Sequence, residues 1–359
     1  MGKGSFFKGR RRFKRRQPLK KEVCKSLIGI LPIKFLALSN HFEYDCMKTS
    51  KYKIIEVASE LGAGKRGTSL AYAALHIADA ERQHPVLSNI PHHKVVDHNH
   101  LIGSKPAYEH AKYISDLLTV NTNICKDVDA VFTEGKFPII VSGDHSNAIG
   151  SIAGVKNHFH DKKVGIIWID AHADLHTPFT TPSGNLHGMP VAVSLGLDNL
   201  DRTRNMVDED LIPYWDKLKR IGSKDISPKI DTTDIVFIAL RDFEIQEYFL
   251  IHDYNMKTFQ PFDIKSLGIA SVIQLTIDYL KDCDVIYISF DVDSLDTTIS
   301  VGTGTPVYNG LQISEAKELL AAFMHLPQTK ALEITEINPL LDNNNKMAKV
   351  VLDILDVVI

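Results

Sequence analysis

The stretch that decides the fold, Val164 to Pro190, reads VGIIWIDAHADLHTPFTTPSGNLHGMP. It begins with an unbroken run of apolar and small residues, Val164 to Ile169, which is typical of a buried strand. Asp170, His172 and Asp174 then follow at every second position. Because alternate side chains of an extended chain point to the same side, the end of this strand presents two carboxylates and an imidazole together. This spacing predicts a metal or catalytic site at the carboxyl end of a buried strand.

Further apolar runs indicate strands elsewhere in the chain, and several of them also end in polar motifs. They cover Tyr52–Ser59, Phe137–Ser142, Asp234–Leu240, Val285–Phe290 and Ala331–Thr335. Helical patterns are predicted between them at Leu70–Arg82, 106–135, Ile269–Leu280, Ser314–Phe323 and Lys346–Val357, whereas 198–230 is expected to be irregular. Strands that alternate with helices favour an α/β fold with a mostly parallel sheet covered on both faces. Open sheets of this kind place their sites at the carboxyl ends of the strands.

Two more motifs extend the possible metal site. Asp291 and Asp293 follow one predicted strand with the same two-residue step, and His145 follows another. Four carboxylates in one crevice would repel one another and raise one another's pKa values, which two divalent cations would relieve. Such an oxygen-rich set without thiolates favours a hard ion such as Mn²⁺, although the imidazoles leave Fe, Ni or Zn open.

The composition describes a large acidic body and a basic arm. The chain has 359 residues, 44% of them hydrophobic, which is enough for one large domain or two small ones. Residues 1–46 hold 12 of the 41 Lys and Arg residues and 3 of the 44 Asp and Glu residues, so the remainder has 29 basic and 41 acidic residues. The four cysteines are scattered and form no CxxC pair, which favours a reducing, cytoplasmic location.

The basic arm, residues 1–46, is interpreted as a disordered leader ahead of a single catalytic domain at 47–359. A basic region followed by an apolar run resembles a signal or transit peptide, and Met47 is an alternative start. The apolar run is interrupted by Pro32 and Lys34, which excludes a transmembrane helix there. The arm could also touch nucleic acid or anionic lipid. The acidic body offers no supporting patch for nucleic acid, so neither nucleic acid nor membrane is expected as a partner.

Three motifs resemble the signatures of the ureohydrolases, the family of arginase, agmatinase, guanidinobutyrase and formimidoylglutamase. They are Ser142–Ser146 (SGDHS), Trp168–Asp174 (WIDAHAD) and Ser289–Asp296 (SFDVDSLD). The loop 177–190 and Gly304–Val307 (GTPV) are similar to arginases in particular. The resemblance extends over roughly residues 52–355 and implies a three-layer α/β/α fold, the arginase-like fold, with a homotrimer or homohexamer as the assembly.

The resemblance also implies a pair of Mn²⁺ ions and a role for each site residue. One ion would be held by His145, Asp170, Asp174 and Asp291, and the other by Asp170, His172, Asp291 and Asp293. A hydroxide bridging the ions would attack the guanidinium carbon of a small guanidino substrate. The catalytic residues would be Asp174, which orients the hydroxide, Glu336, which pairs with the guanidinium, and His187, which shuttles protons. The remaining substrate contacts would come from His176, Thr181, Ser183, Glu244 and Thr305.

Two substrate positions depart from the family pattern, because arginases usually carry asparagine at the position of His176 and aspartate at that of Glu244. The leading hypothesis is hydrolysis of L-arginine to L-ornithine and urea, and the alternative is hydrolysis of agmatine or another guanidino compound. Zinc deacetylases share the layered fold but use one metal, and the complete GDHS and FDVD motifs argue against that class. A non-catalytic binding protein would not need His187 and Glu336 beside intact ligands.

Overall fold

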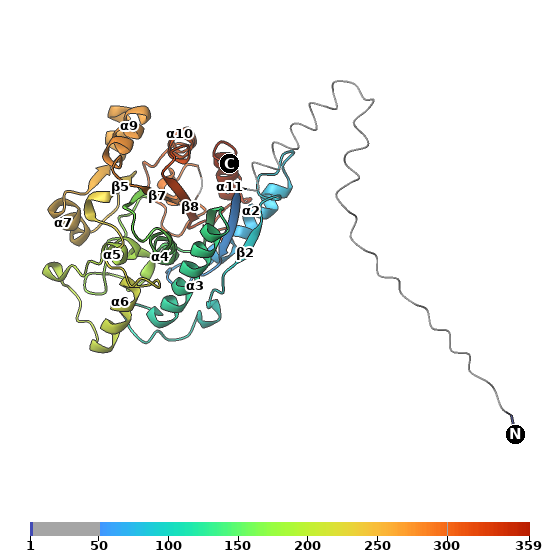
Figure 1. Cartoon of the computed structure of the whole chain (residues 1–359), viewed down its shortest axis with the longest axis horizontal. Coiled ribbons are helices and arrows are strands. Elements are labelled where there is room, and N and C mark those ends of the chain that lie inside the picture. The colour runs from blue at the N-terminus through green and yellow to red at the C-terminus, as the bar shows by residue number, and fades with distance from the viewer. Residues whose placement is uncertain (3–50, 300) are drawn as a thin grey trace. The chain divides into compact units, whose positions relative to one another are not determined.

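One sheet of eight parallel strands organises the computed structural model, which describes residues 1–2, 51–299 and 301–359 (Figure 1). The strands lie in the order β2-β1-β3-β8-β7-β4-β5-β6, and every adjacent pair is parallel. Their bounds are β1 Tyr52–Val57, β2 His92–Lys94, β3 Phe137–Ser142, β4 Val164–Ile169, β5 Ile235–Ile238, β6 Lys257–Phe259, β7 Val285–Asp291 and β8 Thr329–Thr335. The predicted leader, apart from its first two residues, lies outside the described residues.

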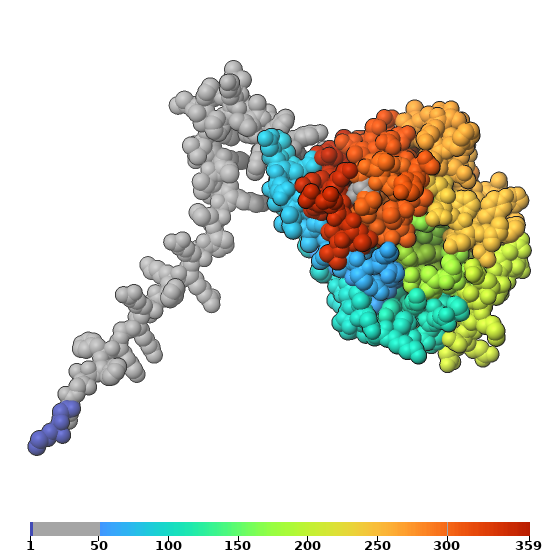
Figure 2. Space-filling model, turned by 180° about the vertical axis from the view of Figure 1, so that it is seen from behind, coloured from blue at the N-terminus to red at the C-terminus, as the bar shows by residue number. Residues whose placement is uncertain are grey.

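Helices cover both faces of the sheet. Their bounds are α2 Ala71–Ala80, α3 Ile114–Thr133, α4 Ala148–His158, α5 Pro190–Leu195, α6 Ile212–Lys219, α7 Ile245–Asp253, α8 Pro261–Leu267, α9 Ile269–Tyr279, α10 Ile313–Met324 and α11 Lys346–Leu355. One layer contains α2 and α8 to α11, and Figure 2 shows part of it, with the red C-terminal segment beside the cyan region that contains α2. The other layer contains α3, α4, α5 and α7.

The strand β4 shows why two helical layers are needed. Ile166 and Trp168 point into the core shared with α3 and α4, whereas Ile167 and Ile169 point into the core shared with α9 to α11. All four side chains are fully buried. A strand that is buried on both faces has an apolar residue at nearly every position, which is what the continuous run predicted. The three-layer α/β/α architecture is therefore confirmed.

Most predicted elements are present, with differences that have local causes. The strands at 137–142 and 164–169 have the predicted bounds. The helix predicted from residue 106 begins only at Ile114, because Tyr113 adopts a left-handed backbone conformation with φ of 58°. The prediction that 198–230 is irregular was wrong for α6, where Pro213 lies in the first turn of the helix, a position that tolerates proline.

The strand order brings the polar motifs together. Strands β3, β8, β7 and β4 are consecutive in the sheet, so the segments that follow them meet at one edge. These segments carry GDHS, TEINP, FDVD and DAHAD, and the neighbouring β5 is followed by RDFE. Among the described residues, no helix is both long and apolar enough to cross a membrane.

Candidate metal centre and substrate cleft

His145 lies in the turn that follows β3 and is held rigidly from three sides. The carboxylate of Asp144 caps this turn by accepting a hydrogen bond from the Ser146 amide at 2.8 Å. The imidazole stacks on the Trp168 ring, with centroids 4.1 Å apart and planes 5° apart. Its Nε2 lies 2.7 Å from the Ser289 hydroxyl. Because Nε2 is engaged there, Nδ1 is the atom left to face the cleft.

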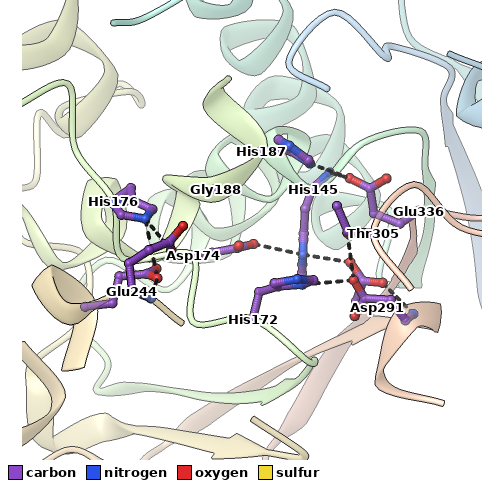
Figure 3. A pocket seen from close by; sticks show the side chains of 12 residues that line it. His145, His172, Asp174, His176, His187, Gly188, Glu244, Asp291, Thr305 and Glu336 are labelled. Carbon is purple, nitrogen blue, oxygen red and sulfur yellow. Dashed lines mark hydrogen bonds and ion pairs between the residues drawn. The ribbon is translucent and has the colours of Figure 1, made fainter. Parts of the chain in front are cut away.

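Three carboxylates converge on this Nδ1 atom. One oxygen each of Asp170, Asp174 and Asp291 lies 3.0, 3.1 and 3.2 Å away. Figure 3 shows the carboxylates of Asp174 and Asp291 on either side of the His145 ring. Nδ1 and the facing oxygens of Asp170 and Asp174 are buried and have no hydrogen-bond partner in the described part of the chain. Buried polar atoms normally have a partner, so three ligand atoms that face one another without one, with the Asp291 oxygen beside them, fit a cation between them.

A second group of ligand atoms shares Asp170. The Nδ1 atom of His172 lies 3.0 Å from an Asp293 oxygen and 3.4 Å from the second oxygen of Asp170. Backbone amides orient these carboxylates: Asp170 accepts from the amide of His172 at 2.7 Å, and Asp291 accepts from that of Asp293 at 2.7 Å. The two-residue step seen in the sequence therefore has two effects. Each later residue places its own side chain among the ligand atoms, and its backbone amide donates to the carboxylate two positions before it.

The buried carboxylates of the two ligand groups would be stabilised by positive charge. Burial, followed by the charges of Asp293 and Asp170, raises the pKa of Asp291 well above its ordinary value. Burial alone would lower the pKa of the His145 imidazole, but the three nearby carboxylates raise it well above its usual range. The raised pKa values mean that the crowded, buried groups favour their protonated forms. A pair of divalent cations would neutralise the same charges, so the donor set fits the expected metals.

The predicted catalytic pair lies directly beside the metal ligands. His187 Nδ1 is 3.1 Å from the Glu336 carboxylate, and the same carboxylate oxygen accepts from the backbone amide of His145 at 3.1 Å. Burial would lower the pKa of His187, but the hydrogen bond and charge of Glu336 raise it. Glu336 and Asp174 have positive φ values of 63° and 52°. Such conformations are uncommon for residues other than glycine and concentrate at functional sites.

The outer wall of the cleft is built by a histidine between two glutamates. His176 Nε2 lies 2.8 Å from Glu244 and 3.4 Å from Glu247, and its Nδ1 lies 3.3 Å from the Thr180 hydroxyl. Both nitrogens of His176 are therefore engaged with protein atoms. The hydrogen bond from His176 is the main cause that lowers the pKa of Glu244 to about 2, whereas burial raises that of Glu247 to about 8.

Of the other three predicted substrate residues, two line the cleft and one does not. Ser183 and Thr305 line its outer part, which has a volume of about 440 Å³. The Thr305 hydroxyl donates to Asp293 at 3.2 Å, so it touches a ligand of the second metal group. Thr181 is buried, and its hydroxyl accepts from the Gly184 amide at 3.0 Å. In the structure Thr181 shapes the loop that carries Ser183, and it is not among the residues that line the cleft.

Two residues that shape the cleft were not predicted from the sequence. Glu247 follows Glu244 by three residues, and the two form a reciprocal capping box at the start of α7, a spacing that could have indicated the pair. Arg241 joins the loops around the cleft by donating to the carbonyls of Asp293 and Val307 at 2.7 and 2.8 Å. No local sequence pattern indicates these hydrogen bonds of Arg241, because the carbonyls that accept them come from a distant part of the chain.

Comparison with known proteins agrees with this geometry. The profile of the Arginase family matches residues 50–359. An arginase of Bacillus subtilis (strain 168) is 32% identical over 310 residues, which cover 84% of this chain and 95% of that protein. An arginase of Staphylococcus aureus (strain COL) is 36% identical over 236 residues, or 65% of this chain and 71% of that protein. The crystal structure of an arginase from Bacillus cereus superimposes with a TM-score of 0.73 at 29% identity, over 86% of this chain and 98% of that one.

The parallel sheet and the carboxylate-rich ligand groups at its edge define a metal-dependent hydrolase of the α/β/α class. The family match over most of the chain completes the assignment. This chain belongs to the arginase family and is an enzyme of the ureohydrolase type.

Proposed function

We propose that this enzyme hydrolyses the guanidinium group of L-arginine to give L-ornithine and urea. The observation that carries the proposal is the pairing of His187 with Glu336 beside the two ligand groups. A carboxylate next to the metal site suits a cationic guanidinium, because charge-assisted hydrogen bonds between these two planar groups are strong. The relatives from Bacillus subtilis and Staphylococcus aureus, which match 84% and 65% of this chain, are arginases.

The metal centre is proposed to hold two Mn²⁺ ions. His145, Asp170, Asp174 and Asp291 would bind one ion, and Asp170, His172, Asp291 and Asp293 would bind the other. A pair of divalent ions supplies a water molecule whose lowered pKa makes it nucleophilic at neutral pH. Asp170 and Asp291 would be the shared ligands, and both are almost completely buried.

The side chains around the ligands would carry the remaining steps. Glu336 holds the guanidinium with its carbon facing the metal centre, and Asp174 orients the attacking water by accepting its hydrogen bond. The bond between the guanidinium carbon and the substrate's side-chain nitrogen breaks, so urea and the amine of ornithine leave. His187 donates the proton that this amine requires, and the raised pKa of its imidazole keeps that proton available near neutral pH.

The amino-acid end of the substrate would lie in the outer part of the cleft. Glu244, whose pKa is lowered to about 2, presents negative charge that suits the α-ammonium group, and Glu247 lies beside it. Ser183 lies on the opposite loop, where its hydroxyl accepts from the Asn185 amide at 3.2 Å and keeps its own proton free to donate to the α-carboxylate. Thr181, Thr305 and His176 would support these contacts.

Agmatine, the decarboxylated analogue of arginine, is a second candidate substrate, because His176 has no ring nitrogen free to bind an α-carboxylate. His176 stands where arginases usually carry an asparagine that helps to bind the α-carboxylate, and here both of its nitrogens contact protein atoms. A site without enough donors for a carboxylate would accept the amine as well. Preference for arginine is therefore the part of the proposal that needs a direct test.

The test is urea release by the full chain after reconstitution with Mn²⁺, with L-arginine and agmatine compared side by side. We expect a higher kcat/KM for arginine and no activity in the presence of a chelator. A higher value for agmatine would replace the proposed substrate with the decarboxylated amine. Absence of urea from both substrates in a folded, metal-loaded protein would refute the proposed reaction.

We also propose that the enzyme is a cytoplasmic homo-oligomer, a trimer or a hexamer, and that residues 1–46 are a leader outside the catalytic domain. The scattered cysteines support a reducing environment, and the two described ones, Cys125 and Cys283, are free and buried. The family match begins at residue 50, which supports a boundary near residue 47. Light scattering of the purified chain measures the assembly.

A further inference from the structure

Lys65 is a free cation on the rim of an otherwise acidic cleft. It is exposed, and it is the only lysine or arginine among the described residues that line the inner and outer parts of this cleft. Across the described ranges 51–299 and 301–359, its ammonium has no ion pair and no hydrogen bond. Most cleft-lining carboxylates, by contrast, already contact a histidine or a backbone amide. Among the cleft-lining residues that the structure describes, Lys65 is therefore the one lysine or arginine whose charge is free for a negatively charged substrate group.

The loop that carries Lys65 is fixed while the ammonium stays free. The Glu60 carboxylate accepts hydrogen bonds from the amides of Gly67 and Ser69 at 2.6 and 3.0 Å. The neighbouring Arg66 turns its guanidinium back onto the loop and donates to the carbonyl of Ala63 at 2.9 Å. The two adjacent cations thus differ in role, because Arg66 stabilises the loop and Lys65 remains available for a ligand.

Lys65 is also close to the groups that would hold the substrate. A Cβ atom placed on Gly304 would lie 3.6 Å from Cβ of Lys65 and 3.8 Å from the Glu336 carboxylate, so both residues flank the same point. Ser183 lines the same part of the cleft as Lys65. A lysine side chain is long and flexible, so an ammonium anchored here can reach a ligand in the outer cleft.

The other polar groups at this end cannot supply positive charge to a carboxylate. Glu244 and Glu247 are carboxyl groups and carry no positive charge, and Glu244, whose pKa is lowered to about 2, suits the ammonium of an amino acid. The two nitrogens of His176 already contact Glu244 and Thr180, at 2.8 and 3.3 Å. An α-carboxylate that enters this cleft therefore needs a donor on the opposite wall, where Ser183 offers a hydroxyl and Lys65 offers a charge.

We propose that Lys65 binds the α-carboxylate of the substrate together with Ser183, and that it makes the cleft prefer an α-amino acid to the corresponding decarboxylated amine. This inference rests on the proposed hydrolysis of a guanidino amino acid. Agmatine has a hydrogen atom in place of the carboxylate, and it would bring its ammonium group towards a lysine that repels it. Lys65 would therefore strengthen the binding of arginine and weaken the binding of agmatine.

The test compares Lys65→Met with the wild-type enzyme, both loaded with Mn²⁺, on L-arginine and agmatine. We expect KM for arginine to rise about three- to tenfold with kcat within twofold, the size typical of a partly solvated ion pair. For agmatine, kcat/KM should stay equal or rise. Lys65→Arg keeps the charge and should restore most of the affinity for arginine. Lys281→Met, in the turn before β7 at the opposite edge of the sheet, removes an exposed lysine far from the cleft and should change neither substrate.

A binding measurement separates failure of this inference from failure of the proposed function. Calorimetry of the Mn²⁺-loaded enzyme with L-ornithine and with putrescine needs no turnover, and only ornithine has an α-carboxylate. Loss of ornithine affinity in Lys65→Met with unchanged putrescine affinity supports the role of Lys65, even if arginine is not the best substrate. The affinity of the wild type for ornithine should also weaken with added salt more than that of the variant. Equal losses for ornithine and putrescine, or no loss for either, would overturn the inference.

Discussion

The inner metal centre and the outer rim of the cleft are built in different ways. The predicted inner ligands lie at or after the ends of the strands β3, β4 and β7, and all but His172 are buried. Backbone amides orient Asp170 and Asp291. The rim residues Lys65, Ser183 and Glu244 stand on loops and are exposed. Strand ends hold atoms within a narrow range of positions, whereas loops tolerate exchange of residues. From this difference we expect the strand ends to set the chemistry and the loops around them to set the choice of substrate.

The largest effect should follow from breaking the inner region at Asp291. Asp291→Ala removes a carboxylate that faces His145 and that we propose to be shared by the two ions, so the variant should lose at least one metal ion. We expect kcat/KM for arginine to fall roughly a thousandfold, because metal stabilisation of charge is worth several kcal/mol. Metal content by mass spectrometry and urea release measure the two effects. Asp282→Ala, which removes an exposed carboxylate from the turn before β7, is the control. Two bound metals and full activity in Asp291→Ala would refute the assignment.

The buried carboxylates of the inner region should make the stability of the protein depend on pH, which the exposed rim should not do. Burial, followed by the charge of Asp170, raises the pKa of Asp174 from 3.8 to about 6 in the metal-free protein. A carboxylate whose pKa is raised on folding contributes stability below its unfolded pKa and loses it as the pH rises through the folded value. The free energy of unfolding of the metal-free protein should therefore fall between about pH 4 and pH 7, by up to about 3 kcal/mol.

Mn²⁺ should remove most of this fall, because the ions then neutralise the carboxylates in place of protons. Thermal unfolding followed by circular dichroism, with chelator or with saturating Mn²⁺, measures Tm across the pH range. Asp174→Asn should flatten the slope of the metal-free protein. A slope that is identical in Asp174→Asn and in the wild type would show that other groups cause it.

A smaller effect, confined to substrate choice, should follow from a change in the outer rim. Ser183→Ala removes a hydroxyl that would bond the α-carboxylate, so kcat/KM for arginine should fall about tenfold, or about 1.4 kcal/mol. Agmatine lacks the carboxylate and should be affected much less. Steady-state kinetics on both substrates provide the measurement, with the exposed Ser266→Ala on α8 as the matched control. If Ser183→Ala weakened both substrates equally, the loop would not discriminate between them.

The smallest effect is expected for the arm, residues 1–46, which we propose to lie outside the catalytic domain. Deletion of residues 1–46 should change kcat/KM for arginine by less than twofold, because the arm contains no predicted ligand and lies before the family match. Urea release and metal content of the shortened protein check this. Light scattering reports whether the assembly is kept. A collapse of activity in a folded, metal-loaded protein would mean that the arm completes the site or the oligomer.

The amino-acid sequence by itself determined the sheet and the ligands. An apolar run such as 164–169 must be covered on both faces, and a two-residue step such as that of Asp291 and Asp293 must place both side chains on one side. Both are local rules, since period and hydrophobicity are properties of neighbouring residues. They were sufficient to predict the fold class and to select the six candidate metal ligands.

Only the tertiary structure decided which side chains on the loops have partners. His176 was expected to bond the substrate, yet its nitrogens contact Glu244 and Thr180, and Lys65 stays free although Arg66 beside it is engaged. These outcomes depend on segments far apart in the chain, which the strand order β3-β8-β7-β4 brings to one edge. A local pattern contains no information on such distant partners, because hydrogen bonds between loops are set by where the whole sheet places them.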